Sequence, residues 1–272
     1  MDIIINNKPL TNEKNSNMND FIDFKGKPLY TYNYKINSQN GEDGILYYIF
    51  RCIGVTNRRC VEICAGNGKE CNTANLILKH NFNGLLFDGN LENVSTGKNY
   101  FRLKEYKSSF GSVNFIHAWI TKKNITNLIK NNNFNGEIDL LSLDLDGVDY
   151  WILKQLLDDK TINPRVIILE YQDIIGPELA ITVPYSDDFN GWTDNWHGPN
   201  YCGASLKAFI ELPNDSGTKN PYGLENPLKG RGGIGQQLSI RHQNDSLKYT
   251  AYFNYDLLMF RYILDIYGNS VE

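Results

Sequence analysis

The stretch from residue 61 to residue 70, Val-Glu-Ile-Cys-Ala-Gly-Asn-Gly-Lys-Glu, constrains the fold more than any other part of the chain. Its apolar start indicates a buried strand, and Gly66 and Gly68 indicate a tight turn that leads into a helix. Glycine has no Cβ and tolerates positive φ, so a ligand can approach the backbone of such a turn. Nucleotide-like ligands bind at strand-to-helix turns of open α/β sheets. A turn without any ligand remains the alternative for this motif alone.

An acidic residue ends the next predicted strand. Leu85–Asp88 is an apolar run that follows the turn at residues 81–84, and Asp88 lies 26 residues after Glu62 (88 − 62). An acid that closes the second strand of a βαβ unit can accept hydrogen bonds from both ribose hydroxyls. The turn and the acid together favour a ligand that contains a nucleoside.

Apolar strands and amphipathic helices alternate through the middle of the chain. The last two strands are continuous apolar runs, which is typical of strands buried on both faces of a parallel sheet. We therefore predict a doubly wound, Rossmann-like α/β fold with a mostly parallel sheet, helices on both faces and ligands at the carboxyl ends of the strands. The predicted strands are Cys60–Ala65, Leu85–Asp88, Val113–Ile120, Ile138–Leu145 and Arg165–Tyr171, and the predicted helices are Asn72–His80, Ile125–Asn131, Asp149–Leu157 and Gly203–Ile210.

Three regions are expected along the chain. Residues 1–37 form an arm or cap, residues 38–212 form the core, and residues 213–272 form an extension that completes or caps it. Residues 176–202 are rich in Gly, Pro, Asp, Trp and Tyr, and their length suits a loop that covers a substrate. The tail from Leu247 to Tyr267 is apolar and aromatic, and we expect a final strand and helix there.

Composition excludes several classes of function. A chain of 272 residues suits one domain with additions, and its net charge of −4 argues against general binding to nucleic acid or to an anionic membrane. No apolar run is long enough to span a bilayer, and the first residues lack the cationic start of a signal peptide. The five cysteines contain no Cys-x-x-Cys pair and point to reduced thiols. We expect a cytoplasmic protein.

The glycine spacing discriminates between nucleotide ligands. A dinucleotide fingerprint needs a third glycine where this chain has Cys71, and no Gly-Lys-Ser/Thr follows for a P-loop. The run Val-Glu-Ile-x-Ala-Gly-Asn-Gly resembles motif I of class I S-adenosylmethionine-dependent methyltransferases, although Cys64 stands where that family most often has glycine. The resemblance implies that the residues contacting the cofactor are Glu62, Ala65, Gly66, Gly68, Asp88, Gly89, Ala118 and Trp119.

A second element precedes this motif. Ser38-Gln39-Asn40-Gly41-Glu42-Asp43 leads into the apolar run 45–50, which reads as a helix that Ser38 or Asn40 can cap. The element is similar to one in FkbM-type methyltransferases, where it packs over the cofactor pocket. That similarity adds Gln39 to the expected cofactor-binding residues.

A cluster of carboxylates is predicted at the ends of the fourth and fifth strands. Asp144 and Asp146 are two residues apart and can face the same side, and Glu170 ends the neighbouring strand. These acids can cap helices, or they can share one hard cation. The stretch looks like the Asp-x-Asp-Gly-x-x-Tyr motif of the same methyltransferase group. The resemblance to magnesium-dependent sugar O-methyltransferases implies Asp144 or Asp146, together with Glu170, as ligands of Mg²⁺, whereas some of the wider family need no metal.

The remaining candidates concern the acceptor. A sugar hydroxyl is a poor nucleophile at neutral pH, so a general base or a cation would assist the transfer. Asp144 or Asp146 is the expected base, and His197 is the alternative. Tyr171, Trp192 and Trp196 are expected to contact a sugar.

The sequence therefore predicts an S-adenosylmethionine-dependent methyltransferase that acts on an oxygen of a small polar acceptor, a sugar or sugar nucleotide, with Mg²⁺ as a candidate metal. Nucleic acid and membrane are not expected as partners, and a homo-oligomer stays open. The alternatives are an NAD-dependent oxidoreductase and a non-catalytic nucleotide-binding protein.

Overall fold

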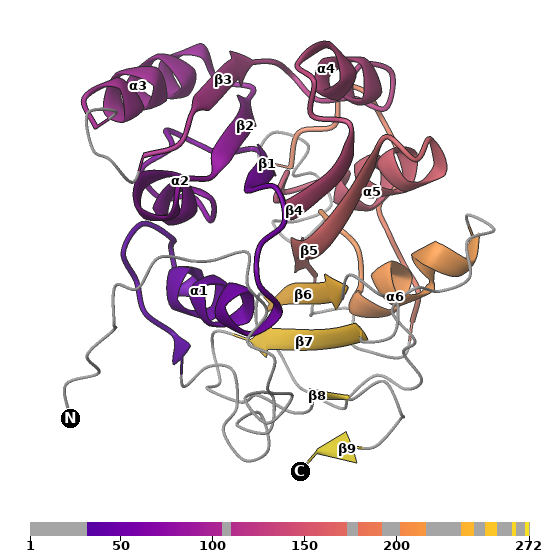
Figure 1. Cartoon of the computed structure of the whole chain (residues 1–272). Helices are drawn as coiled ribbons and strands as arrows, with labels where there is room; N and C mark the ends of the chain where they lie inside the picture. Colours follow the sequence, from indigo (N-terminus) through magenta and orange to yellow (C-terminus); the bar gives the residue numbers. More distant parts are fainter. Residues whose placement is uncertain are drawn as a thin grey trace.

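The structure is a computed structural model, and it describes residues 32–104, 110–172, 179–191, 202–215, 235–241, 248–254, 263–264 and 270–271. Strands and helices alternate through most of it (Figure 1). The elements in chain order are α1 (Glu42–Ile53), β1 (Arg59–Ile63), α2 (Ala74–His80), β2 (Asn83–Asp88), α3 (Leu91–Arg102), β3 (Val113–His117), α4 (Ile125–Asn131), β4 (Gly136–Leu143), α5 (Asp149–Asp158), β5 (Ile162–Tyr171), α6 (Leu206–Asp215), β6 (Gly235–Arg241), β7 (Lys248–Asn254), β8 (Ile263–Leu264) and β9 (Ser270–Val271).

The main sheet has the strand order β3-β2-β1-β4-β5-β6-β7. Strands β1 to β5 are parallel to one another, and the hairpin of β6 and β7 adds two antiparallel strands at the β5 edge. The strand order reverses between β1 and β4, and ligands of open α/β sheets bind outside the carboxyl ends of the strands at such a point. The protein thus has the doubly wound, Rossmann-like α/β fold that the sequence predicts.

Helices cover both faces of this sheet. The first hydrophobic cluster joins α1, α2 and α3 to one face, and the second joins α4, α5 and α6 to the other (Figure 1). Alternate residues of a strand enter different clusters, as with Leu140 in the first and Leu141 in the second. Burying one leucine completely contributes roughly 1.5–3 kcal/mol, so two packed faces explain why the central strands are apolar at consecutive positions.

The helix α3 has no counterpart among the predicted elements. Only Val94, Gly97 and Phe101 of its residues are buried, so its apolar stripe is narrow and gives a weak periodic signal. Its clearest local mark is the N-cap Asn90, whose side-chain oxygen accepts hydrogen bonds from the backbone N–H groups of Glu92 and Asn93.

Several predicted boundaries differ from the structure, and three of the differences have a visible local cause. The N-cap of α1 is Gly41 at φ 97° and not Ser38 or Asn40, although Ser38 Oγ accepts a hydrogen bond from the Asp43 N–H at 3.1 Å. The strand β3 ends at His117 rather than at residue 120, because the chain leaves the sheet there. The helix α6 starts at Leu206, since Gly203 instead donates its N–H to the Gly147 carbonyl at 2.9 Å.

The region after α6 also differs from expectation. The described parts of the tail from residue 247 to residue 267 are the strands β7 and β8, and these parts contain no counterpart of the predicted helix. The strand β6 pairs with β5 from Val166 to Tyr171, so part of the predicted C-terminal extension belongs to the same sheet as the core.

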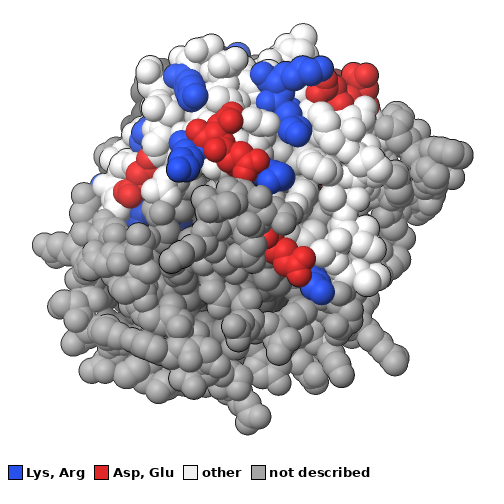
Figure 2. Space-filling model, turned by 90° about the vertical axis from the view of Figure 1, so that its right-hand side faces the viewer, with Lys and Arg blue, Asp and Glu red and all other residues white. Residues whose placement is uncertain are grey.

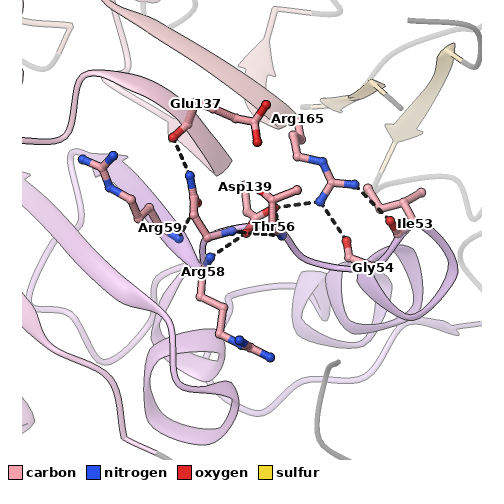
Figure 3. A network of polar contacts seen from close by, with 9 residues as sticks. Ile53, Gly54, Thr56, Arg58, Arg59, Glu137, Asp139 and Arg165 are labelled. Atoms are coloured by element: carbon pink, nitrogen blue, oxygen red, sulfur yellow. Dashed lines mark hydrogen bonds and ion pairs between the residues drawn. The ribbon is translucent and has the colours of Figure 1, made fainter. Parts of the chain in front are cut away.

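A buried ion pair holds the amino edge of the sheet. Asp139 near the start of β4 and Arg165 near the start of β5 lie 2.7 Å apart (Oδ1 to Nη1), and both side chains are almost fully buried (Figure 3). Arg165 also donates to the carbonyls of Ile53 and Gly54 at the end of α1. The carboxylate of Asp139 accepts further bonds from the loop at residues 56–58. This network fixes the end of α1 against the sheet.

Charges of both signs are interspersed on the face of the molecule shown in Figure 2. Helix α5 carries the ion pair of Lys154 with Asp158, and α6 carries that of Lys207 with Glu211. Within the described ranges, no helix combines the length and the apolar character that a membrane span requires.

Candidate active site

The turn after β1 has the backbone conformation that its glycines suggest. Gly66 and Gly68 have φ angles of 55° and 70°, and Cys64 is also left-handed at 68°. A Cβ on Gly66 would meet no atom within 4 Å, so the backbone there is open to a ligand. A Cβ on Gly68 would lie 2.7 Å from the Phe101 ring, so this second glycine permits packing against α3.

Glu62 lies beneath this turn and is 4% exposed. Its carboxylate accepts hydrogen bonds from the backbone N–H groups of Asn72 (2.8 Å) and Thr73 (2.9 Å) and from the Thr73 hydroxyl. Burial raises the pKa of Glu62, and these hydrogen bonds oppose that rise. The structure therefore shows Glu62 organising the start of α2, while a direct contact of Glu62 with a cofactor stays a prediction.

Asp88 at the end of β2 is the next acid of the site. Its Oδ1 accepts from the Asn90 N–H at 2.8 Å and from Asn93 Nδ2 at 3.2 Å, and its Oδ2 lies 4.0 Å from Cys64 Sγ. Burial is the main reason that the pKa of the Cys64 thiol is raised, followed by the charge of Asp88. The thiol therefore stays protonated at neutral pH and is a poor nucleophile.

A cavity of about 450 Å³ lies at the carboxyl ends of β1 to β4. Five of the predicted site residues line it, namely Asp88, Gly89, Ala118, Trp119 and Asp146. The structure adds further lining residues that the sequence did not single out as site residues, namely Cys64, Asn90, Asn93, Ile120, Leu145, Val148, Asp187, Phe189, Asn190 and Gly191. The predicted residues Ala65, Gly66 and Gly68 belong to the turn beside the cavity and not to its lining.

Residues 179–191, which we call the strap, form one wall of this cavity. Asp187 is its anchor, because its carbonyl accepts from Trp119 Nε1 at 2.8 Å and its carboxylate pairs with Lys123 and with the Tyr185 hydroxyl. Lys123 and Tyr185 lower the pKa of Asp187, which is therefore ionised at neutral pH. The carbonyl of Val183 accepts from Trp151 Nε1, which fixes the strap to α5 as well.

The three acids predicted at the ends of β4 and β5 do come together. One oxygen each from Asp144, Asp146 and Glu170 lies within 4.8 Å of the other two. Burial, with a smaller contribution from neighbouring carboxylates, raises the pKa of Asp144 to about 7. Burial and then the charge of Asp144 raise the pKa of Glu170 to about 10. At neutral pH the Asp144 and Glu170 carboxyls therefore retain a proton between them.

Asp149 fixes the turn that presents two of these acids. Its oxygens accept from the N–H groups of Leu145 (2.7 Å) and Gly147 (3.0 Å), so it plays the role of a first-turn acid of α5. A Cβ on Gly147 would lie 2.6 Å from the Phe189 ring, so this glycine allows the strap to approach.

The segment before α1 is folded around Asp43. Its Oδ2 accepts from the N–H groups of residues 36–38 at 2.6–2.8 Å. Asn37 donates to the Lys69 carbonyl and to the Tyr100 hydroxyl, so the segment reaches the turn after β1. Gln39 is exposed on this segment and does not line the cavity, so its contact with a cofactor stays a prediction.

The structure describes only some of the residues that were predicted to contact or activate the methyl acceptor. Tyr171 is 8% exposed and packs in the hydrophobic cluster of α4, α5 and α6, so its contact with a substrate stays a prediction. Trp192, Trp196 and His197 lie outside the described residues.

The missed lining residues had weak but physical signals. Asn90 and Asn93 belong to the capped start of α3, and the pattern Asn-x-x-Asn before a helix could have indicated them. The strap residues follow no periodicity, and only the composition of residues 176–202 pointed to that segment.

Comparison with known proteins gives similarity in structure only. No family model matches the sequence, and no curated protein is similar enough to count as a relative. An S-adenosylmethionine-dependent methyltransferase from Clostridium acetobutylicum ATCC 824 is 15% identical over 78% of this chain, with a TM-score of 0.30; the match spans 65% of that protein, slightly less than two thirds.

Two further structures contain S-adenosyl-L-homocysteine. They are methyltransferases from Thiobacillus denitrificans (12% identity, 70% of this chain, 68% of that chain, TM-score 0.39) and from Geobacter sulfurreducens (12% identity, 73% and 70%, TM-score 0.39). Each of these TM-scores is below 0.5, so we base the function on the residues of the site itself.

Proposed function

We propose that this protein is an S-adenosylmethionine-dependent methyltransferase that methylates an oxygen of a small polar acceptor, a sugar or sugar nucleotide. The observation that carries the proposal is the pairing of Glu62 with the start of α2, next to a cavity that Asp88 lines. This pairing discriminates between the two enzyme classes that the sequence leaves open.

An NAD-dependent enzyme needs the N–H groups at this helix start. In a dinucleotide-binding fold the pyrophosphate lies on the N-terminus of the helix after the first strand. Here the Glu62 carboxylate accepts hydrogen bonds from the N–H groups of Asn72 and Thr73, the two residues directly before α2, so a carboxylate of the protein already lies at this helix start. This arrangement favours a cofactor without phosphates over a dinucleotide.

The cavity is also suited to a cationic cofactor that contains adenosine. S-adenosylmethionine carries a sulfonium and an ammonium group against one carboxylate, a net charge of about +1 at neutral pH. Asp88 and Asp146 line the cavity, and Asp88 Oδ2 can accept a hydrogen bond from a ribose hydroxyl. Trp119, half-exposed at 49%, offers a ring beside Gly89 on which a base can stack.

The acids beside the cavity supply what the transfer of a methyl group requires. S-adenosylmethionine supplies a methyl group on a positively charged sulfur. A carboxylate such as Asp144 accepts the proton of the acceptor hydroxyl as the oxygen–carbon bond forms, and its pKa of about 7 suits that role at neutral pH. Asp149 holds Asp144 and Asp146 in place through the turn that it caps. A purely nucleotide-binding protein would not need this cluster.

The same acids fit a divalent metal. Three carboxylate oxygens within 4.8 Å of one another form a hard donor set of the kind that Mg²⁺ prefers, and their mutual repulsion would be relieved by a cation. Asp144 and Glu170, with Asp146, would hold the ion. It would lower the pKa of an acceptor hydroxyl.

Calorimetric titration tests the cofactor. S-adenosylmethionine, S-adenosylhomocysteine, NADH and ATP are titrated into the full-length protein, with Mg²⁺ and with EDTA. We expect micromolar binding of the first two and none of the phosphate-containing pair. Asp88→Ala should weaken binding at least about tenfold, whereas Asp159→Ala on the exposed end of α5 should not. Binding of NADH alone would reject the proposal.

A further inference from the structure

Side-chain oxygens already bind several backbone N–H groups at the carboxyl edge of the sheet. Glu62 accepts hydrogen bonds from the two residues directly before α2, and Asp149 accepts them from the turn directly before α5. At α3, the side-chain oxygen of Asn90 accepts hydrogen bonds from the N–H groups of Glu92 and Asn93. Each of these three connections therefore places an oxygen of the protein where it competes with a phosphate for backbone N–H groups.

The cavity itself is lined by negative charge. Asp88, Asp146 and Asp187 are among its described lining residues, which include no lysine or arginine. Lys123 neutralises Asp187 from the outside, where its own side chain is 82% exposed. The charged side chains in its described lining are therefore all acidic, and they repel an anionic ligand more strongly in a partly buried site than in water.

The described residues between β5 and α6 extend this charge. From residue 166 to residue 206 the described part of the chain holds no lysine or arginine and three acids, which are Glu170, Asp187 and Asp188. Residues 144–149 of the neighbouring connection add three aspartates. The described charged side chains of both connections are therefore all acidic. Phosphate groups are recognised by arginine, lysine or unpaired N–H groups, and these connections provide none of the basic side chains.

From these observations we infer that the methyl acceptor carries no phosphate: it is a neutral or cationic hydroxyl compound, such as a free sugar or an amino sugar, and not a sugar nucleotide. The inference rests on the proposed function and narrows its acceptor. A divalent cation bound by three ionised carboxylates would leave a residual negative charge, so the preference holds with the metal present as well.

Matched acceptors test this inference. Formation of S-adenosylhomocysteine is measured for the full-length protein with glucose, glucosamine, galactose and galactosamine, and with the 1-phosphate and uridine diphosphate derivative of each, in Mg²⁺ and in EDTA. We expect turnover to be confined to the unphosphorylated compounds. A phosphorylated compound that is methylated at least as fast as its unphosphorylated counterpart would overturn the inference.

Anion binding gives a second readout that does not depend on the choice of sugar. Pyrophosphate and uridine diphosphate are titrated into protein saturated with S-adenosylhomocysteine, and we expect no binding at millimolar concentration. Asp188→Lys, which places a cation on the strap beside the cavity, should bind pyrophosphate at least tenfold more tightly than the wild type. The matched control Asp159→Lys, on the exposed end of α5, should not. Wild-type protein that binds either anion as tightly as Asp188→Lys would contradict the inference.

The two proposals fail in different ways. If neither S-adenosylmethionine nor S-adenosylhomocysteine binds, the proposed function is wrong. If both bind, and a phosphorylated compound is methylated at least as fast as its counterpart or the wild type binds an anion as tightly as Asp188→Lys, only the acceptor inference is wrong.

Discussion

The surroundings of an aspartate differ at the two ends of strand β4. At the amino edge, Asp139 is fully buried, and it accepts bonds from the Arg165 guanidinium and from three backbone N–H groups. At the carboxyl edge, Asp144 faces Asp146 and Glu170, and none of the ion pairs among the described residues includes it. Two carboxylates five residues apart (144 − 139) on one chain segment therefore meet opposite electrostatic environments.

The contrast separates a structural role from a chemical one. Asp139 and Arg165 pair with each other and with the backbone, so this network holds the end of α1 in place. No lysine or arginine among the described residues forms an ion pair with the Asp144 cluster, and the Asp144 and Glu170 carboxyls keep a proton at neutral pH, which suits them to exchange a proton or bind a metal. The ion pair of Asp139 with Arg165 thus stabilises the amino edge of the sheet. At the carboxyl edge, carboxyl groups without such a partner are available for proton transfer or metal binding.

The largest effect is expected from breaking the pairing at the amino edge. Asp139→Asn leaves the Arg165 charge buried without its carboxylate, and removing one partner of a buried ion pair costs about 3–5 kcal/mol. Urea unfolding measures the free energy of unfolding. Asp159→Asn, whose exposed side chain accepts from Thr126 and Gln155, should cost less than about 1 kcal/mol. If both variants lost the same free energy of unfolding, the structural role assigned to Asp139 would be wrong.

The same substitution at the other end of β4 should affect chemistry and not stability. Asp144→Asn removes one of the mutually repelling carboxylates, so we expect the free energy of unfolding to stay within about 1 kcal/mol of the wild type. Turnover should fall at least about 100-fold, because the proton acceptor is lost. Glu137→Gln, at an exposed position near the start of β4, is the control. Full turnover in Asp144→Asn would remove this residue from the site.

A smaller effect is expected where the strap is anchored. Trp119→Phe keeps an aromatic ring but removes the hydrogen bond to the Asp187 carbonyl, which is worth about 1 kcal/mol. The Kd of S-adenosylhomocysteine should therefore rise about fivefold in calorimetry, and the free energy of unfolding should fall by no more than about 1 kcal/mol. Tyr34→Phe, an exposed ring outside the cavity, should leave the Kd unchanged. An unchanged Kd in Trp119→Phe would show that the strap does not shape the cofactor site.

The smallest effect concerns a group at the amino edge that is not paired. His80 ends α2, its Nδ1 has no hydrogen-bond partner among the described groups, and burial lowers its pKa to about 4. In the unfolded state His80 takes up a proton below about pH 6.5, whereas in the folded state it does so only below about pH 4. The free energy of unfolding therefore decreases as the pH falls from 6.5 to 4. His80→Gln should reduce this loss by under about 1 kcal/mol at pH 5. Urea unfolding of both proteins across this pH range would measure the difference. An identical dependence of the unfolding free energy on pH would contradict the prediction.

The sequence predicted the parts of this molecule whose pattern is set by burial. Continuous apolar runs located β4 and β5, and acids at strand ends located Asp88, Asp144, Asp146 and Glu170 at one edge. The helix α3 was not predicted because its buried stripe is narrow. The strap lies within the loop predicted at residues 176–202, but its contacts could not be predicted because they join residues far apart in the sequence, such as Asp187 and Trp119. The sequence predicted that Glu62 contacts a ligand. Only the structure could show that its carboxylate accepts hydrogen bonds from the N–H groups of Asn72 and Thr73.

The hairpin of β6 and β7 has a consequence for how the protein is synthesised. The strand β5, which carries Glu170, pairs on one side with β4 and on the other with β6, and Glu170 lies opposite Gln236. When ribosomal synthesis has passed α6 but not yet reached residue 235, β5 is an edge strand with open hydrogen-bonding groups, a form prone to pairing with other chains. The acidic site can therefore reach its final form only after β6 has been made, although Asp144, Asp146 and Glu170 are translated much earlier.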